Sequence, residues 1–334
     1  MSDTAVSRLE QKDLEEFKKF CLEAWGAPHA LIHDETSFEY YYRAADGSLN
    51  FALARDDSGE ILSVCGYILS NSTGNPDAWI SFLVSKKGAP FGLAYRLFDF
   101  IIETTRCRTI GCNNIREKTR GLYEFRGWSV ETLSHYYRLN PALNEYTLCK
   151  LATIDIPSVE HSAIEAKRIT DERGLEPFEK TVLPENLPYK DRLYLERRYF
   201  NNPWFAYEAA GIFDGGEPVA LVFYKQIDTE GESVLRVVDF IGDTRALPAA
   251  GEYLDRQMRE RSAEYCDWYA YGLKEADMRR AGFALRARGG ENIVPNYLEP
   301  PLCENTDFFF FTSELEGYRV FKADGDQDRP NLQL

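Results

Sequence analysis

The most constraining feature of this sequence is the order of parts between Ala78 and Trp128. A run of apolar and β-branched residues, 78–84, leads into a polar loop that contains glycine, and an amphipathic helix follows. A second short apolar run, 108–114, is followed by another helical segment that stops at Gly127. Helices and strands that alternate in this way predict an α/β chain with mixed sheets.

The second half of the chain repeats this order in weaker form. A hairpin pattern with the turn DDSGE has a later counterpart with the turn DGGEP, and the turn glycines Gly59 and Gly216 lie 157 residues apart. The helix-stop glycines Gly127 and Gly282 lie 155 residues apart. These near-equal spacings indicate a duplicated α/β unit.

The duplication predicts how the chain is divided. We expect a first unit over 1–140, a proline-containing connector over 141–199 and a second, degenerate unit over 200–334. A length of 334 residues suits two domains of roughly 150 residues each.

Charge and composition exclude several classes of partner. The formal net charge is −15, so a phosphate-rich partner is repelled except at a local basic patch, and we expect neither nucleic-acid nor membrane binding. No apolar run approaches the roughly 20 residues of a membrane span, and the polar N-terminus lacks a signal-peptide core. We expect a cytoplasmic protein. The seven cysteines form no CxxC pair, which favours reduced core thiols over a metal site. The oligomeric state is not indicated.

The loop before the first helix has the composition of an anion site. Gly88, Gly92 and Ala94 are small enough for close backbone approach, and Lys86 and Lys87 add local positive charge. Unpaired amides and the helix dipole at such a helix start favour a pyrophosphate. The alternative is a strand-to-helix turn with two solvated lysines.

With its flanking segments, this stretch resembles the GNAT superfamily of acyl-CoA-dependent N-acyltransferases. Gly92-Leu93-Ala94 matches the loop that holds the coenzyme A pyrophosphate in that family, and Asn114, Tyr123 and Gly127-Trp128 match the segment beside the pantetheine arm. The resemblance implies that coenzyme A, as acyl-CoA, is the co-substrate. It covers the first 140 residues well and the second unit only in outline, since the glycine loop is missing there.

The same resemblance implies roles for individual residues. Leu83 or Val84 would offer a backbone N–H to the thioester carbonyl, and Tyr123 would protonate the leaving thiolate. A tyrosine packed against a sheet is the structural alternative. One departure concerns the loop, where the usual Gln or Arg is Ala89, so that Lys86 or Lys87 would supply the cation.

Several longer phrases resemble one group within that superfamily. WGAPHAL, LERRYFNNPWFAYE and KADGDQDRPN are similar to the tandem sugar N-acyltransferases of surface-polysaccharide pathways, such as those of lipopolysaccharide O-antigen. The resemblance implies an acceptor amine on a nucleotide-linked amino-deoxy sugar, with dTDP as the expected nucleotide, acylated by direct attack. The second unit would contribute to the acceptor site.

The proton acceptor for the amine is harder to assign. His29 is the preferred candidate among the polar residues near position 30, because an imidazole takes up protons near neutral pH. Asp239 is an acid inside an apolar strand, where burial is costly without a partner or a ligand. Each has a structural alternative: a hydrogen-bonded histidine and a strand-end acid in a salt bridge. The tail KADGDQDRPN is either loose or faces a ligand, and its spacing does not favour a metal.

Two other functions stay open at the level of sequence. The tandem could be a ligand-binding module without catalysis, or an aminoacyl transferase acting on cell-wall precursors. Enzymes of the latter kind carry a long helical arm and a more basic surface, and this sequence indicates neither.

Overall fold

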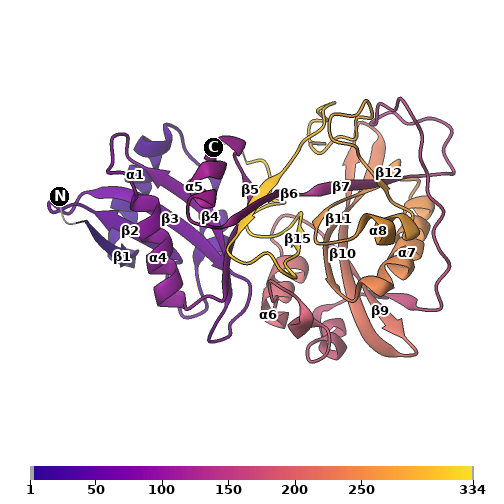
Figure 1. Cartoon of the computed structure of the whole chain (residues 1–334), viewed down its shortest axis with the longest axis horizontal. Helices are drawn as coiled ribbons and strands as arrows, with labels where there is room; N and C mark the ends of the chain where they lie inside the picture. Colours follow the sequence, from indigo (N-terminus) through magenta and orange to yellow (C-terminus); the bar gives the residue numbers. More distant parts are fainter. Residues whose placement is uncertain (1–3, 333–334) are drawn as a thin grey trace. The chain divides into compact units, whose positions relative to one another are not determined.

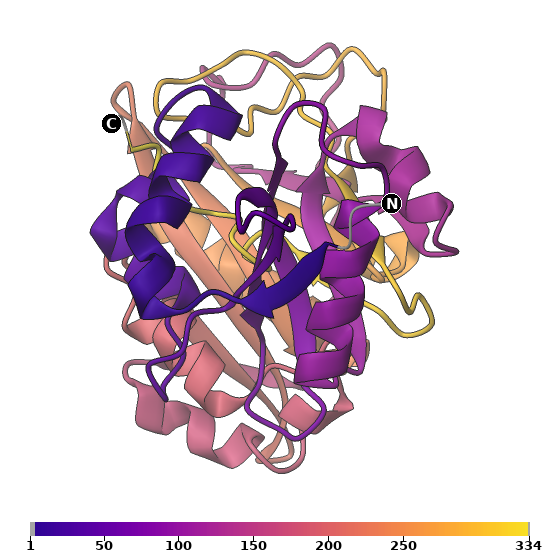
Figure 2. The same cartoon turned by 90° about the vertical axis from the view of Figure 1, so that its left-hand side faces the viewer.

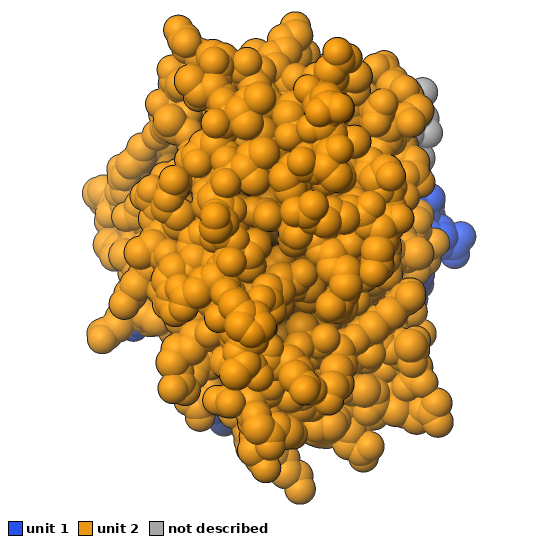
Figure 3. Space-filling view, turned by 90° about the vertical axis from the view of Figure 1, so that its right-hand side faces the viewer, with its two compact units in different colours: residues 1–113, 311–314, 325–334 blue, residues 114–310, 315–324 orange. Residues whose placement is uncertain are grey.

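The computed structural model describes residues 4–332, which form two compact units. Among these residues, the first unit comprises 4–113, 311–314 and 325–332, and the second comprises 114–310 and 315–324 (Figures 1 and 3). These units differ from the predicted segments. Residues 114–140 belong to the second unit, and two short C-terminal stretches return to the first.

The first unit is a sheet flanked by helices. Its strands are β1 (Ala5–Arg8), β2 (Phe51–Arg55), β3 (Ile61–Leu69), β4 (Asp77–Ser85) and β5 (Thr109–Ile115), with the end of β14 (Phe309–Thr312); its helices are α1 (Leu14–Trp25), α2 (Ala30–His33), α3 (Glu35–Tyr42) and α4 (Leu93–Thr105). The strands follow the order β1-β2-β3-β4-β5-β14. Neighbours are antiparallel from β1 to β4, whereas β4 and β5 are parallel. In Figure 2, α1 and α4 lie on either side of the strands.

Apolar periodicity explains why these helices cover the sheet. Phe17 of α1 and Phe38 of α3 are buried against Phe51 of β2, with ring centroids 4.7 and 5.9 Å from that ring. Leu97 and Ile101 of α4, four residues apart, are fully buried. Side chains at this spacing share one helix face, so each helix buries a single apolar stripe.

The predicted hairpin of the first unit is confirmed as β2 and β3. Asp56 accepts hydrogen bonds from the backbone N–H groups of Ser58 and Glu60, and Gly59 takes φ +89°. Glycine adopts this left-handed conformation without steric cost, so DDSGE forms a tight turn.

The second unit contains a larger mixed sheet. The strands of this unit are β6 (Ser129–Thr132), β7 (Ser134–Leu139), β8 (Glu165–Ile169), β9 (Glu208–Asp214), β10 (Glu217–Thr229), β11 (Glu232–Gly242), β12 (Tyr265–Tyr271), β13 (Ala284–Leu285) and β15 (Val320–Phe321), of which β6 lies outside the larger sheet. Its helices are α5 (Arg120–Glu124), α6 (Arg192–Leu195), α7 (Leu247–Glu260) and α8 (Glu275–Arg280). One sheet has the order β13-β7-β12-β11-β10-β9-β8, and β15 pairs with β12.

Strand pairing explains the difference from the predicted boundaries. β7 pairs with β12 over six positions, so residues 134–139 belong to the second sheet. β8 pairs with β9, so part of the predicted connector is also an edge strand of that sheet. The predicted turn at Gly216 is confirmed between β9 and β10.

The two units share one order of elements. In the first, β4, α4 and β5 follow a hairpin; in the second, β11, α7 and β12 follow the hairpin β9–β10. In both, the strands before and after the helix are parallel neighbours. The expected tandem α/β architecture therefore describes the observed topology. None of the helices between residues 4 and 332 combines the length and the apolar character that a membrane span requires.

Candidate functional site

The first unit has an interrupted strand pair in the middle of its sheet. β4 and β5 pair only from Asp77 with Thr109 to Trp79 with Gly111. Beyond these residues β4 continues to Ser85, and no ladder pair joins it to β5 within the part of the chain that the structure describes. The edge of β4 that faces β5 is therefore open along Leu83 and Val84, the two residues predicted to offer a backbone N–H.

A bulge lies on β4 where this open edge begins. Gly66 of β3 pairs with Phe82 and Tyr67 pairs with Ile80, so Ser81 is the extra residue on β4. The Ser81 hydroxyl lies 2.8 Å from the Tyr42 hydroxyl of α3. Bulges re-aim backbone groups and are over-represented next to active sites. Sequence reasoning missed Ser81 and Tyr42, because alternation of apolar residues does not show where a strand carries an extra residue.

His29 lies beside this bulge. Its ring packs edge-on against the Phe82 ring of β4 at 5.1 Å and against the Trp25 ring of α1 at 4.8 Å between centroids. Its backbone N–H donates to His33 Nδ1 at 3.0 Å. The Nδ1 atom of His29 is buried and has no hydrogen-bond partner among residues 4–332.

The imidazole of His29 is held neutral by its surroundings. Burial lowers the pKa of His29 to about 4, and the positive charge of Arg329 and the neighbouring His33 contribute in the same direction. A neutral imidazole near pH 7 can accept a proton or a hydrogen bond, so His29 is available as an acceptor at the bulge.

The C-terminal tail reaches the point where β4 and β5 separate. A Cβ atom on Gly325 would lie 3.5 Å from Trp79 Cβ, and the buried Asp326 forms an ion pair with Arg329. The charge of Asp326 adds to burial in raising the pKa of both Tyr42 and Cys112. Residues 325–329 therefore pack within the first unit and are not loose, and the other alternative, that the tail faces a ligand, stays a prediction.

The predicted pyrophosphate loop connects β4 to α4. Gly88 and Gly92 take φ +83° and +90°, and Gly92 is the N-cap of the 13-residue helix α4. Gly92 brings no side-chain oxygen to cap the helix, and a Cβ there would meet no atom within 4 Å. The first amides of α4, at Leu93 and Ala94, thus begin a helix whose dipole favours an anion.

The two lysines of this loop differ in their surroundings. Lys86 Nζ lies 2.5 Å from Glu60 Oε1, and this ion pair raises the Lys86 pKa. Lys87 is exposed and has no ion pair among residues 4–332. Lys87 is therefore the lysine whose charge is available to a bound anion.

The corresponding parts of the second unit are occupied by the chain itself. β11 and β12 also separate, after Val237 and Trp268. Here, however, β15 pairs with β12 at Tyr271. In addition, the backbone N–H of Ala323 donates to Val238 O at 3.0 Å. Before α7, Asp243 accepts a hydrogen bond from the backbone N–H of Arg245 at 2.8 Å and so caps the short 3-10 helix Thr244–Ala246. This capped turn leads directly into α7, where the first unit has its glycine loop.

Asp239 of β11 belongs to a buried ion-pair network in the second unit. Lys190 Nζ contacts both carboxylate oxygens of Asp239 at 2.7 Å and Asp324 at 2.6 Å, and the Tyr199 hydroxyl donates to Asp239 at 2.7 Å. Asp239, Lys190 and Asp324 are at most 3% exposed. These partners balance the buried acid without any ligand, and a role for Asp239 in catalysis stays a prediction.

Asn114 and Tyr123 also lie in the second unit. Asn114 is exposed at φ +61°, and Tyr123 is buried in α5. Gly127 takes φ +80°, and Trp128 N donates to Tyr123 O at 3.2 Å, so the predicted helix stop is confirmed. The catalytic role of Tyr123 and the coenzyme A contact of Asn114 stay predictions.

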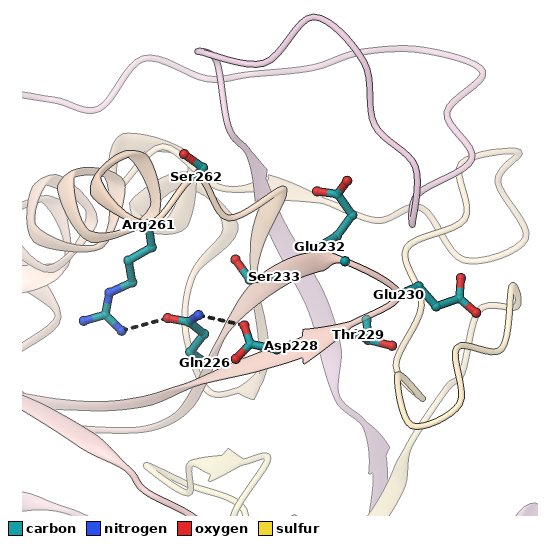
Figure 4. Close-up of a pocket in the computed structure, with 9 residues that line it drawn as sticks. Gln226, Asp228, Thr229, Glu230, Glu232, Ser233, Arg261 and Ser262 are labelled. Carbon is teal, nitrogen blue, oxygen red and sulfur yellow. Dashed lines mark hydrogen bonds between the residues drawn. The ribbon is translucent and has the colours of Figure 1, made fainter.

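A separate hollow of about 560 Å³ lies at the end of the β10–β11 hairpin (Figure 4). It is lined by Gln226, Asp228, Thr229, Glu230, Gly231, Glu232, Ser233, Arg261 and Ser262. Gln226 bridges Arg261 and Asp228. No residue predicted for the site lies here. Among the described residues, no group of three or more His, Cys, Asp or Glu side chains could hold a metal ion.

The network around Asp239 predicts how its replacement acts. Asp239→Asn should lower the free energy of unfolding by about 3 kcal/mol, because breaking a buried ion pair leaves Lys190 poorly compensated. Asp243→Asn, which alters a partly exposed helix cap, should cost only about 1 kcal/mol. Urea denaturation measures both. Equal losses in the two variants would contradict a buried network of this strength, and a changed acceptor KM at unchanged stability would support a catalytic Asp239 instead.

Comparison with known proteins was made by sequence and by structure. No protein-family model matches the chain, and no curated protein matches it. Among solved structures, a GCN5-related N-acetyltransferase from Anabaena variabilis has a TM-score of 0.55 at 10% identity, covering 93% of this chain and 72% of that one. A GCN5-related N-acetyltransferase from Kribbella flavida has a TM-score of 0.53 at 10% identity, and the match covers 93% of this chain and 71% of that one. The chain therefore has the fold of the GCN5-related N-acetyltransferases, as the sequence predicts.

Proposed function

We propose that the protein is an acyl-CoA-dependent N-acyltransferase whose first unit binds coenzyme A. The observation that carries this proposal is the open edge of β4, which leads directly into a glycine-capped helix start. An open strand edge offers backbone N–H and C=O groups, and the helix start offers amides with a favourable dipole. The fold shared with the N-acetyltransferases supports the same activity.

Each part of coenzyme A has proposed partners in this unit. The pyrophosphate would lie on the amides of Gly88, Gly92, Leu93 and Ala94, with Lys87 as the nearby cation. The pantetheine arm would follow β4, where Leu83 or Val84 offers a backbone N–H to the thioester carbonyl. Such a donor stabilises the negative charge that develops on the carbonyl oxygen during acyl transfer. Asn114, which belongs to the second unit, stays a predicted contact from its match to the family segment.

The proposed reaction is direct attack of an amine on the thioester. The amine nitrogen forms a bond to the carbonyl carbon, the carbon–sulfur bond breaks, and the surplus amine proton passes to His29. Tyr123 donates a proton to the departing thiolate. The buried Nδ1 of His29, which has no hydrogen-bond partner among residues 4–332, supports this placement of the acceptor.

The acceptor proposed is the amine of a nucleotide-linked amino sugar. The support for this substrate class is the resemblance of segments such as WGAPHAL and LERRYFNNPWFAYE to tandem sugar N-acyltransferases. His29, within the first of these segments, lies at the bulge of β4. Transfer of an aminoacyl group is less well supported, because the longest helix among the described residues is α7, with 14 residues.

The activity can be tested by mixing the protein with acetyl-CoA or longer acyl-CoAs and with dTDP- or UDP-linked amino sugars. We expect release of free coenzyme A and an amino sugar heavier by one acyl group. Both should be measured by chromatography with mass detection, because the exposed Cys303 would react with a thiol reagent. Coenzyme A binding without turnover for any acceptor would indicate a binding module.

Binding of coenzyme A to the loop predicts the effect of a charge at Gly92. Gly92→Glu should weaken coenzyme A binding by about tenfold or more, since it places a carboxylate and a side chain at the proposed pyrophosphate position. Gly59→Glu is the matched control, because Gly59 also has a positive φ and open space but lies in the hairpin turn. Calorimetry should show the loss only for Gly92→Glu. Equal affinity in the two variants would contradict the placement.

The role proposed for Tyr123 predicts a selective loss of rate. Tyr123→Phe keeps the buried ring but removes the proton, so kcat should fall by about 10² to 10⁴ with little change in KM. Tyr146→Phe, which removes a hydrogen bond from a tyrosine hydroxyl to Asn140 O, should leave kcat unchanged. Steady-state and single-turnover kinetics test this. A wild-type rate in Tyr123→Phe, with chemistry rate-limiting, would mean that water or another group supplies the proton.

A further inference from the structure

Among the described residues of the first unit, Phe91 is the most exposed large apolar side chain. It is 91% exposed, whereas Leu22 and Trp25 of the same unit are 40% and 41% exposed. Burial of a phenylalanine ring is favourable, and Phe91 gains almost none of this stabilisation within the chain. A contact with another molecule would supply it.

The backbone before Phe91 is fixed by a turn. The backbone N–H of Ala89 donates to Lys86 O at 3.0 Å and closes this turn, in which Gly88 takes φ +83°. Glycine adopts this conformation without steric cost. Pro90 follows directly, and its ring restricts its own φ to a narrow range. The exposed ring is therefore presented by a defined loop.

The backbone after Phe91 is fixed by the start of α4. Gly92, the next residue, is the N-cap of this helix, and its carbonyl oxygen accepts the backbone N–H of Tyr95 at 3.1 Å. The Phe91 ring lies nearly perpendicular to the Tyr95 ring, with 6.4 Å between the centroids. This contact leaves Phe91 91% exposed, so a face of its ring is open to a planar ligand.

Phe91 lies next to the proposed place of the coenzyme A pyrophosphate. Neighbouring Cα atoms are about 3.8 Å apart, so the ring starts beside Gly92, one of the amides assigned to the pyrophosphate. A Cβ atom on Gly88 or Gly92 would meet no atom within 4 Å, so the space over both glycines is open. In coenzyme A a single ribose joins the adenine to the pyrophosphate, and the base must therefore lie close to this loop.

A planar base fits this ring better than a protein surface does. Nucleobases stack on aromatic side chains, and one ring is enough for a stack. A stable protein interface, in contrast, buries about 800 Å² on each partner. Lys87 of the same loop is exposed, and its charge suits the phosphates of a nucleotide.

We propose that Phe91 stacks on the adenine of coenzyme A and thereby selects the complete co-substrate over fragments that lack the nucleotide. This inference rests on the proposed function, because it takes the pyrophosphate to lie on residues 88–94. Since the loop is already formed, stacking requires little ordering of the protein. Phe91 binds the co-substrate and takes no part in the chemical step, so its loss should act on affinity and KM rather than on kcat.

Two ligands separate a stack on adenine from other roles of the loop. 4′-Phosphopantetheine keeps the pantetheine arm of coenzyme A but lacks the adenosine. Phe91→Ala should bind coenzyme A about tenfold more weakly, as loss of one base–aromatic stack does, and should bind 4′-phosphopantetheine as the wild type does. Ile154→Ala, which removes an apolar side chain that is 63% exposed in the second unit, should change neither affinity. Calorimetry measures both ligands.

A second variant gives an optical readout of the same contact. Phe91→Trp should keep the affinity for coenzyme A, because an indole ring also stacks on a base. Coenzyme A should quench the fluorescence added at position 91, and 4′-phosphopantetheine should not. The wild type, with its five tryptophans, supplies the background.

Each outcome decides for or against the proposal. Equal affinity of Phe91→Ala and the wild type for coenzyme A would overturn it and leave the proposed function intact. An equal loss for both ligands would also overturn it, because the loop itself would then be damaged. A wild type that binds no coenzyme A would remove the proposed function and this inference with it. If Phe91→Ala does not fold, the presence or absence of quenching in Phe91→Trp decides.

Discussion

The separation of β4 from β5 is the constraint on which the candidate site depends. Two parallel strands that pair over three positions and then diverge leave backbone groups of β4 without a neighbouring strand. Unpaired backbone groups within a fold are costly unless water, a side chain or a ligand satisfies them. The bulge at Ser81, the ring of His29 and the charged tail gather at the start of this opening. Stability of the sheet favours pairing of both edges of β4, whereas a binding site at β4 needs one edge to stay unpaired.

The two units meet this constraint in different ways. In the second, β15 and Ala323 supply hydrogen bonds where β11 and β12 diverge, and the carboxylate of Asp243 caps the short 3-10 helix that leads into α7. In the first, the helix start carries glycine and the edge of β4 stays open. The same order of elements is thus compatible with an open strand edge in one unit and a paired, capped one in the other.

Local sequence was sufficient for much of the fold. The DDSGE and DGGEP turns, the glycine-capped start of α4 and the helix stop at Gly127 all depend on short-range chemistry, and each was predictable. Long-range pairings were not. Three such pairings join segments far apart in sequence: Lys190 with Asp239, Tyr42 with Ser81, and the charge of Arg329, which lowers the pKa of His29. A single sequence does not show which distant side chains form a hydrogen bond or an ion pair, because local sequence preferences are the same for many alternative pairings.

The return of the C-terminal segment also has a consequence for synthesis. Residues 311–314 and 325–334 belong to the first unit, although the rest of that unit ends at residue 113. The first unit therefore lacks these two stretches until residues 114–310 of the second unit have been made. Gly325 cannot pack on Trp79, and Arg329 cannot act on His29, until translation has passed these positions. Domains generally fold as they emerge, with the N-terminal one first. In this protein the first unit is completed only after the residues of the second unit have been made, so a chain that stops before residue 325 lacks the charge that acts on its own candidate site.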